Sequence, residues 1–375
     1  MRLTRALYFL SSNGFYVHAK NKTPNWLPIL SQGEKQIGYS SSLRSLLSLK
    51  YLFNEEVSTL VAYLRKLVGT GHPLLKLASN MLDSPPKTAH ARSVLLLLIS
   101  KAAGIPSSTE MNSTDIKHGL HENQRHLAEI IEMIHLGMLG HRGNLDDSST
   151  IQENRSDLEQ GNKLAVLGGD YLLSQACGRL ADFKQSEVVE TIGTAIKDCV
   201  KAEFYLDEKK SLQTLSEWYK LTALSVANLV AYGCRASLQL VNHSKLMQDN
   251  AYYLCRHIIF SCMMYNDISQ YAIQTSTTDN TTNTTPLSSS SLMLYGLSPV
   301  QLSYPYSMAK ELEQHDPSKP ITYTDKLTLD KCREQCVRET YKGFQLLEKF
   351  PDQSSQAVDT LRTILQQTQE GVMKT

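Results

Sequence analysis

The stretch Gly161-Asn162-Lys163-Leu164-Ala165-Val166-Leu167-Gly168-Gly169-Asp170-Tyr171-Leu172-Leu173 decides the fold. It contains no proline and is rich in leucine, which predicts a helix. Ala165 and the two adjacent glycines present almost no side chain, so a second helix can approach closely at this point. We therefore expect a helix here that packs tightly against a neighbouring helix.

Apolar residues at helical spacing recur on both sides of this stretch. An upstream stripe consists of Leu60, Leu64, Leu67 and Val68, and a proline-free run over 122–141 carries Leu127, Ile130, Ile131, Ile134 and Met138. Further helices are predicted over residues 164–180, 188–204, 215–241, 251–271 and 332–350. No alternating pattern with hairpin turns predicts strands. The expected fold class is all-α.

Three segments interrupt the helical pattern. Residues 83–87 form a Pro-Pro turn, residues 142–160 are polar and irregular, and residues 275–291 are a low-complexity Thr, Asn and Ser segment typical of a loop. None of them has the length and composition of a linker between two separate cores. We expect a single helical-bundle domain over residues 34–375.

The composition excludes several classes of function. The 375 residues include 38 basic and 37 acidic residues, so neither nucleic acid nor an anionic membrane is expected as the main partner. The longest wholly apolar run, 94–99, is too short to cross a bilayer, and no transmembrane segment is expected. The seven cysteines form no CxxC pair, and Cys332 and Cys336 lack a nearby histidine pair. They are expected to be reduced.

The N-terminal segment has the composition of a mitochondrial transit peptide. Its first acidic residue is Glu34, and it carries four basic residues and three leucines at helical spacing: Arg2, Arg5, Lys20, Lys22, Leu3, Leu7 and Leu10. A secretory signal with residues 6–10 as its apolar core is the alternative, but that core is short and lacks a clear cleavage site. We expect residues 1–33 to direct import into the mitochondrial matrix.

The stretch over 161–173 resembles a segment of the trans-polyprenyl diphosphate synthases, which reads Gly-Asn-Lys, a small apolar run, then Gly-Asp and aromatic-Leu-Leu. Glu132-Met-Ile-His135 is similar to the helix that leads into the first Asp-rich motif of that family. Arg92-Ser-Val-Leu-Leu-Leu-Leu resembles the helix after the family's phosphate-binding turn, and Ser298-Pro299-Val300 matches a Leu-Pro-Val before a late helix. The resemblance covers roughly residues 40–350 and implies the isoprenoid synthase bundle.

Members of this family ionise an allylic diphosphate and add isopentenyl diphosphate to the resulting cation. The resemblance implies that two Asp-Asp-x-x-Asp motifs hold magnesium ions on the leaving diphosphate. Magnesium requires hard oxygen ligands, and a departing diphosphate requires concentrated positive charge. These requirements define which residues an active chain would need.

Both Asp-rich motifs have decayed in this chain. The first reads Arg142-Gly143-Asn144-Leu145-Asp146 and keeps a carboxylate only at its last position. The second reads Asn266-Asp267-Ile268-Ser269-Gln270 and keeps only Asp267. A divalent ion about 4 Å from Arg142 would be repelled by roughly 8 kcal/mol at an effective dielectric near 20, an upper limit because the side chain could turn away. We expect no metal site in this chain.

The phosphate-binding cations have been lost as well. Ala89 and His90 stand where the family has Lys and Arg, so that only Arg92 remains as a vestige of the phosphate-binding turn. Between Arg256 and Lys310 there is no Lys or Arg. The chain by itself is therefore expected to have no catalytic residues and no cofactor.

Some surviving residues have more than one interpretation. Asp146 could be an ordinary loop acid or part of a residual metal site. Asp170 follows two glycines and is interpreted as a residue that positions its helix. Arg142 could instead contact a diphosphate in a partner's site. The histidines between 118 and 141 lack a convergent further ligand, and His135 is interpreted as a core residue.

Within the family, the chain most resembles the second-subunit branch of the decaprenyl and solanesyl synthases, through residues 65–75, 141–143 and 161–163. That resemblance implies a heterotetramer with a catalytic subunit that binds Mg²⁺ and isoprenoid diphosphates and makes the ubiquinone side chain. The predicted subunit interface consists of Asn162, Lys163, Val166, Gly169, Asp170 and Leu173. Two alternatives are a stand-alone isoprenoid-binding pseudoenzyme and an active prenyltransferase with reduced metal binding.

Overall fold

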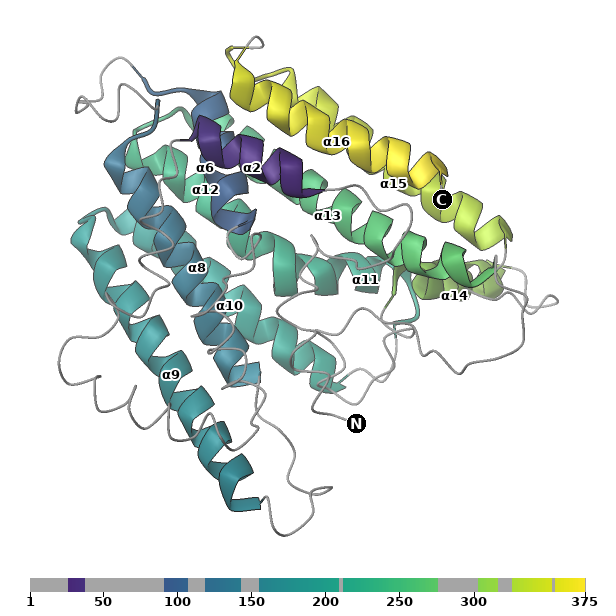
Figure 1. Cartoon of the computed structure of the whole chain (residues 1–375), viewed down its shortest axis with the longest axis horizontal. Helices are drawn as coiled ribbons and strands as arrows, with labels where there is room; N and C mark the ends of the chain where they lie inside the picture. Colours follow the sequence, from purple (N-terminus) through teal and green to yellow (C-terminus); the bar gives the residue numbers. More distant parts are fainter. Residues whose placement is uncertain are drawn as a thin grey trace.

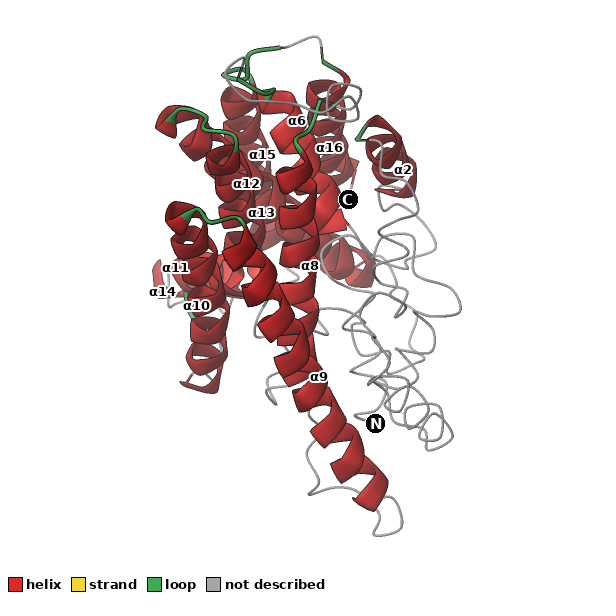
Figure 2. Ribbon diagram, turned by 90° about the vertical axis from the view of Figure 1, so that its left-hand side faces the viewer, coloured by secondary structure: helices red, strands yellow, loops and turns green. Residues whose placement is uncertain are grey.

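The structure is a computed structural model that describes residues 26–37, 91–106, 119–142, 155–208, 212–275, 303–315, 326–352 and 355–374. Within these ranges every regular element is a helix, which confirms the predicted all-α class (Figure 2). The helices are α2 (Trp26–Gln36), α6 (Ala91–Ala103), α8 (Glu122–Arg142), α9 (Arg155–Asp182), α10 (Ser186–Glu208), α11 (Leu215–Thr222), the π-helical turn η4 (Ala223–Ala227), α12 (Asn228–Leu240), α13 (Lys245–Thr275), α14 (Tyr304–His315), α15 (Lys326–Leu347) and α16 (Gln356–Lys374).

Helix α13 runs through the middle of the bundle (Figure 1), and α6 packs against it. Helix α13 packs against α12, α15 and α16, and α6 packs against α8, α12 and α16. The side chains of residues 94–99 in α6 are all buried. A helix that is apolar on all sides is stable only inside the protein, so this run forms core rather than a membrane segment. No helix in the described ranges has the length and apolarity needed to cross a membrane.

Helices α8 and α9 approach each other closely through glycines. A Cβ atom added at Gly140 would lie 2.9 Å from the carbonyl oxygen of Ala165, and one at Gly169 would lie 2.8 Å from the carbonyl oxygen of Gly137. These distances are too short for any side chain, so the backbones are in direct contact. The close approach predicted for the 161–173 stretch is confirmed, and α8 is its neighbour (Figure 2).

The predicted helix over 215–241 is present but not uniform. It divides into α11, one π-helical turn and α12. Within the π turn, Ser225 Oγ donates a hydrogen bond to the carbonyl oxygen of Leu221 at 2.7 Å. A serine that bonds back to the preceding turn competes with the regular backbone pattern, and π turns interrupt helices locally.

The structure also differs from the predicted elements at three places. Helix α9 begins at Arg155, so the last part of the 142–160 segment is helical rather than irregular. Helices α2 and α16 were not predicted, and they pack against each other and against α6. Helix α2 crosses the predicted domain boundary at residue 33. Ile29 within it and Ile37 directly after it are buried. The leucine stripe over 60–68, the turn over 83–87 and residues 276–291 lie outside the described residues.

Candidate functional site

Asp267 is the surviving carboxylate of the second Asp-rich motif, and it anchors the start of α14. It lies on α13 and is 6% exposed. Its Oδ2 atom accepts a hydrogen bond of 2.8 Å from the backbone N–H of Tyr304, the first residue of α14. The first N–H groups of a helix have no partner within the helix, so this carboxylate satisfies one of them. Asp267 therefore has a structural role in joining two helices.

The surroundings of Asp267 do not suit a magnesium ligand. Burial raises the pKa of Asp267 to about 7, although the hydrogen bonds from Tyr304 and from the Trp218 side chain act to lower it. Asn266 beside it is also buried. Among the residues that the structure describes, no three His, Cys, Asp or Glu side chains come together as a metal site. Asn266 and Asp267 of the second Asp-rich motif do not fit Mg²⁺, which requires several convergent oxygen ligands.

Arg92, the remaining cation of the phosphate-binding turn, forms an ion pair inside the bundle. Its NH1 atom lies 3.7 Å from Oε2 of Glu132 on α8. The other carboxylate oxygen of Glu132 accepts hydrogen bonds from the backbone N–H of Ser93 at 3.1 Å and from Ser93 Oγ at 3.0 Å. Burial lowers the pKa of Arg92, whereas Glu132 raises it. The guanidinium group of Arg92 thus stabilises the contact between α6 and α8.

The first motif lies almost entirely beyond what the structure describes. Helix α8 ends at Arg142. The side chains of Arg142 and Gln270, together with Gly143 and Asp146, lie outside the described residues. The alternatives for Arg142 and Asp146 remain predictions.

Of the six residues predicted for the subunit interface, some contact other parts of this chain and others are exposed. Gly169 is buried against α8, and Leu173 packs against the core, so both contribute to contacts within the chain. Asp170 Oδ1 lies 3.0 Å from His141 Nε2 and links α9 to α8. Lys163 is exposed, and the side chains of Asn162 and Val166 are partly exposed.

Exposed apolar residues occur on α9 and on the next helix. On α9, Leu167 is 53% exposed and Tyr171 is also exposed. On α10, Val189 and Val200 are exposed and Phe204 is 65% exposed. Scattered exposed apolar residues are common on proteins, but large side chains this open on two consecutive helices suit a contact with another protein.

The partners of Asp267 and Arg92 were not identified from the sequence. Glu132 lies in a quoted motif but was given no role, and Tyr304 and Trp218 were not singled out. Glu132 and Ser93 are 39 residues apart, and Asp267 and Tyr304 are 37 residues apart. No local spacing rule connects residues at such distances, so the pairs emerge only from the packing.

The arrangement of helices defines the class of protein. The decaprenyl diphosphate synthase from Rhodobacter capsulatus has a similar structure, with a TM-score of 0.62 over 91% of this chain and 99% of that one, at 14% identity. A medium/long-chain length prenyl pyrophosphate synthase from Arabidopsis gives a TM-score of 0.53 over 82% of this chain and 98% of that one, at 21% identity. The chain has the all-helical fold of the prenyl synthases.

The sequence comparisons narrow this class to one family. The polyprenyl synthetase family profile matches residues 74–282. All trans-polyprenyl-diphosphate synthase PDSS2 of Homo sapiens is 36% identical over 284 residues, which cover 73% of this chain and 70% of that protein. A probable hexaprenyl pyrophosphate synthase, mitochondrial, of Neurospora crassa is 29% identical over 69% of each chain. The chain belongs to the polyprenyl synthetase family, which confirms the resemblance found in the sequence.

Proposed function

We propose that this chain is the non-catalytic, obligatory partner subunit of a hetero-oligomeric trans-polyprenyl diphosphate synthase. The complex, a heterotetramer, adds isopentenyl diphosphate units to an allylic diphosphate and makes the side chain of ubiquinone. The catalytic subunit binds Mg²⁺ and the isoprenoid diphosphates. This chain contributes folded surface to the assembly and no catalytic residue.

One observation carries the proposal: the two surviving charges of the family motifs whose side chains the structure describes, Asp267 and Arg92, both have partners inside the chain. Asp267 holds the N-terminus of α14, and Arg92 is paired with Glu132. A buried carboxylate oxygen that already accepts a hydrogen bond from a backbone N–H is a poor ligand for a divalent ion. A guanidinium already paired with a buried carboxylate is a poor ligand for a diphosphate.

The similarity to PDSS2 supports a role in a polyprenyl diphosphate synthase, and the exposed apolar residues of α9 and α10 support a partner chain. A large hydrophobic contact is typical of subunits that assemble permanently. We propose that the interface includes Leu167, Tyr171 and Phe204, with Lys163 and Val166 beside them. Gly169 and Leu173 act indirectly, because they set how α9 lies on α8.

We further propose that the chain acts in the mitochondrial matrix. The basic, acid-free N-terminus and the mitochondrial designation of the Neurospora crassa relative support this location. Helix α2 begins at Trp26 and buries Ile29 in the bundle core. Cleavage at residue 33 would remove most of that helix, so we place the end of the transit segment before residue 26 instead.

The decisive experiment is co-expression with the Asp-rich polyprenyl synthase of the same organism. Each chain alone and the co-purified mixture are assayed for long-chain product from isopentenyl diphosphate and an allylic primer with Mg²⁺. Product only in the mixture is expected. In addition, Asp267→Asn in this chain should leave the activity of the mixture within twofold of the unmodified value, since its carboxylate binds no metal.

The proposed interface is tested with matched surface substitutions. Leu167→Asp and Phe204→Asp should abolish co-purification and activity, because each places a charge in a desolvated contact. Leu246→Asp on α13 is the control, since Leu246 is also exposed and lies on a different helix. It should co-purify normally. Equal behaviour of all three variants would remove α9 and α10 from the interface.

The two alternative functions correspond to other outcomes of the same assay. Magnesium-dependent product from this chain alone would show an active prenyltransferase with reduced metal binding. Migration as a monomer in the presence of the catalytic subunit would favour a stand-alone isoprenoid-binding protein.

A further inference from the structure

A pocket of about 510 Å³ opens between α11, α13, α14 and α15. Its apolar wall is built from aromatic rings, Tyr219, Tyr253, Phe260 and Tyr304. The rings of Tyr219 and Phe260 meet edge to face, with centroids 5.2 Å apart and an interplanar angle of 87°. Interlocked aromatic rings hold their positions and present flat apolar surface. This wall suits a ligand with a flat, apolar body.

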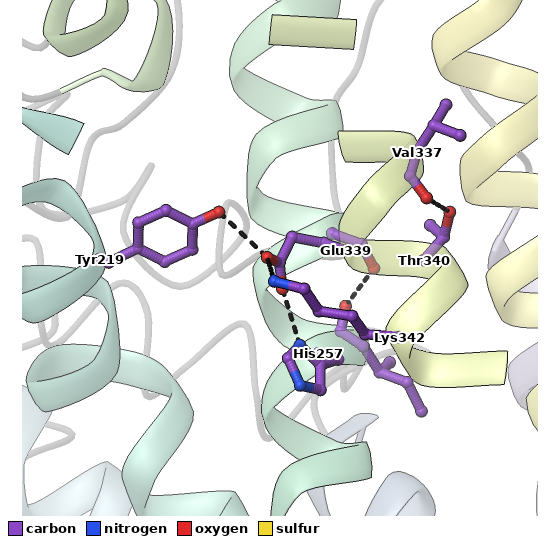
Figure 3. A network of polar contacts seen from close by, with 8 residues as sticks. Tyr219, His257, Val337, Glu339, Thr340 and Lys342 are labelled. Atoms are coloured by element: carbon purple, nitrogen blue, oxygen red, sulfur yellow. Dashed lines mark hydrogen bonds and ion pairs between the residues drawn. The ribbon is translucent and has the colours of Figure 1, made fainter. Parts of the chain in front are cut away.

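The polar wall of the pocket is organised by Glu339 of α15, which is 3% exposed (Figure 3). Its carboxylate contacts His257 Nδ1 at 2.7 Å, Lys342 Nζ at 2.6 Å and the Tyr219 hydroxyl at 3.2 Å. Burial raises the pKa of Glu339, but the donors His257 and Lys342 outweigh it and the net pKa is lowered. The carboxylate is therefore ionised at neutral pH.

The ionised Glu339 determines which nitrogen of His257 carries a hydrogen and which one remains for a ligand. An ionised carboxylate only accepts hydrogen bonds, so His257 Nδ1 carries the hydrogen that joins the two residues. The second ring nitrogen, Nε2, is left for another partner. Glu339 also neutralises the charge of Lys342.

Arg256 provides a positive charge that nothing in the described part of the chain neutralises. Its guanidinium carbon lies 5.5 Å from the centroid of the Tyr252 ring and 5.3 Å from that of Phe260. Its NH1 atom donates a hydrogen bond to the Tyr252 hydroxyl at 3.4 Å, and its buried Nε atom has no hydrogen-bond partner among the described residues. None of the ion pairs in the described ranges includes Arg256. The pocket thus holds one unbalanced cation.

We propose that this pocket binds a small organic anion, in which one carboxylate or phosphate group is joined to a flat apolar body. Its volume lies in the range of about 300–1,000 Å³ that is usual for small-molecule sites. The anionic group pairs with Arg256, whose planar fork of donors matches carboxylate and phosphate oxygens, and it accepts a hydrogen bond from His257 Nε2 when the imidazole is protonated on both nitrogens. The body of the ligand lies against Tyr219, Tyr253 and Phe260.

An acidic side chain of another protein is a weaker fit to the same features. A single carboxylate would satisfy Arg256 but would leave most of the pocket and its aromatic wall unfilled. The proposal concerns this chain alone and does not depend on its role in a synthase complex.

The test is calorimetric titration of the full chain with benzoate and with phenyl phosphate, and with benzamide as the uncharged probe of the same shape. Both anions should bind at least tenfold more tightly than benzamide. Arg256→Gln should weaken the binding of both anions at least tenfold. Arg338→Gln removes an exposed cation one residue from Glu339 and should change the affinity by less than twofold.

Arg256 also stacks on two rings, so circular dichroism must show that Arg256→Gln remains folded. If it does not, Tyr253→Ala decides, because Tyr253 is exposed at the rim and its loss should weaken binding of both anions three- to fivefold without unfolding the chain. The proposal is overturned if neither anion binds at millimolar concentration, if benzamide binds equally well, or if the folded variants bind as the unmodified chain does. Tighter binding of an acidic tripeptide than of benzoate would assign the pocket to protein docking and also overturn it.

Discussion

Asp267 and Glu339 are both almost completely buried, yet their pKa values shift in opposite directions. Asp267 receives hydrogen bonds from a backbone N–H and from the Trp218 side chain, which carry no charge, and burial raises its pKa to about 7. Glu339 receives hydrogen bonds from His257 and from the cationic Lys342, and its pKa is lowered. Neutral donors do not compensate for desolvation of a carboxylate, whereas cationic donors do.

The difference explains why the two regions have different uses. The region around Asp267 has lost the cations and carboxylates that diphosphate chemistry requires, and the remaining carboxylate joins α13 to α14. The region around Glu339 retains a surplus cation, Arg256, beside a pocket. The two regions share α13, α14 and Tyr304, but the Asp267 carboxylate bonds to the start of α14, whereas Arg256 lines a pocket.

The largest effect is expected at Glu132. This carboxylate is buried, like those of Asp267 and Glu339, and it is paired with the cation Arg92. Glu132→Ala leaves Arg92 buried without its partner and the N–H of Ser93 without an acceptor. The free energy of unfolding should fall by about 3–5 kcal/mol. Chemical denaturation followed by circular dichroism measures it. Glu122→Ala on the same helix removes only an exposed contact with His126 and should change stability by less than about 0.5 kcal/mol.

Asp267→Leu should have the next largest effect. Leucine fills the space but leaves the backbone N–H of Tyr304 buried without an acceptor. The cost is about 1–3 kcal/mol relative to Asp267→Asn, which keeps an acceptor oxygen. Chemical denaturation of the two variants at the same pH measures the difference. Equal stability of the two variants would mean that Asp267 does not anchor α14.

The pH dependence of stability distinguishes the two carboxylates by sign. Because the pKa of Asp267 is raised in the folded state, the folded chain binds more protons than the unfolded chain between pH 4 and pH 7. Stability should fall as the pH rises through this window, by at most about 1.4 kcal/mol per pH unit for one group. Asp267→Asn should remove this contribution. Glu129, whose pKa burial also raises to about 7, contributes a similar slope that the variant retains.

Glu339→Gln should have the smallest effect and the opposite pH profile. The pKa of Glu339 is lowered in the folded state, so its contribution is present above the pKa of the unfolded chain and is lost as the pH falls. At pH 7 the variant should lose only about 1 kcal/mol, because the exposed Lys342 can turn to water. The variant and the unmodified chain should converge as the pH falls through the lowered pKa of Glu339. Divergence at low pH would contradict the assignment of charge to Glu339.

Most of the fold could be predicted from the sequence, because apolar residues at helical spacing reveal which face of each helix is buried. The helices over 122–141 and 164–180 were predicted in this way. The small residues of 161–173 predicted the close approach of another helix, and the structure identifies that helix as α8. Helix α16 was not predicted, although Val358, Leu361 and Leu365 have the same spacing. Helix α9 begins earlier than predicted, because the polar composition of its first turns resembles that of a loop.

The candidate site was predicted only in part. The loss of the Asp-rich motifs is visible in the residues themselves, and Asp146, Asp267 and Arg92 were identified as the survivors. The partners of Asp267 and Arg92 were not identified, since Tyr304 and Glu132 come from distant parts of the chain. The Glu339 pocket combines residues of four helices, and no motif in the sequence marks it.

The sequence by itself determined the all-α class, the membership of the polyprenyl synthetase family and the absence of most family ligands from the two motifs. These properties depend on residue identity and periodicity, and a carboxylate that is missing from the chain cannot be restored by folding. The tertiary structure alone decided what the remaining charges do. Burial and hydrogen-bond partners set the pKa values of Asp267 and Glu339, and they left Arg256 without a counter-charge in the described ranges. Burial and the choice of partners depend on which helices pack together.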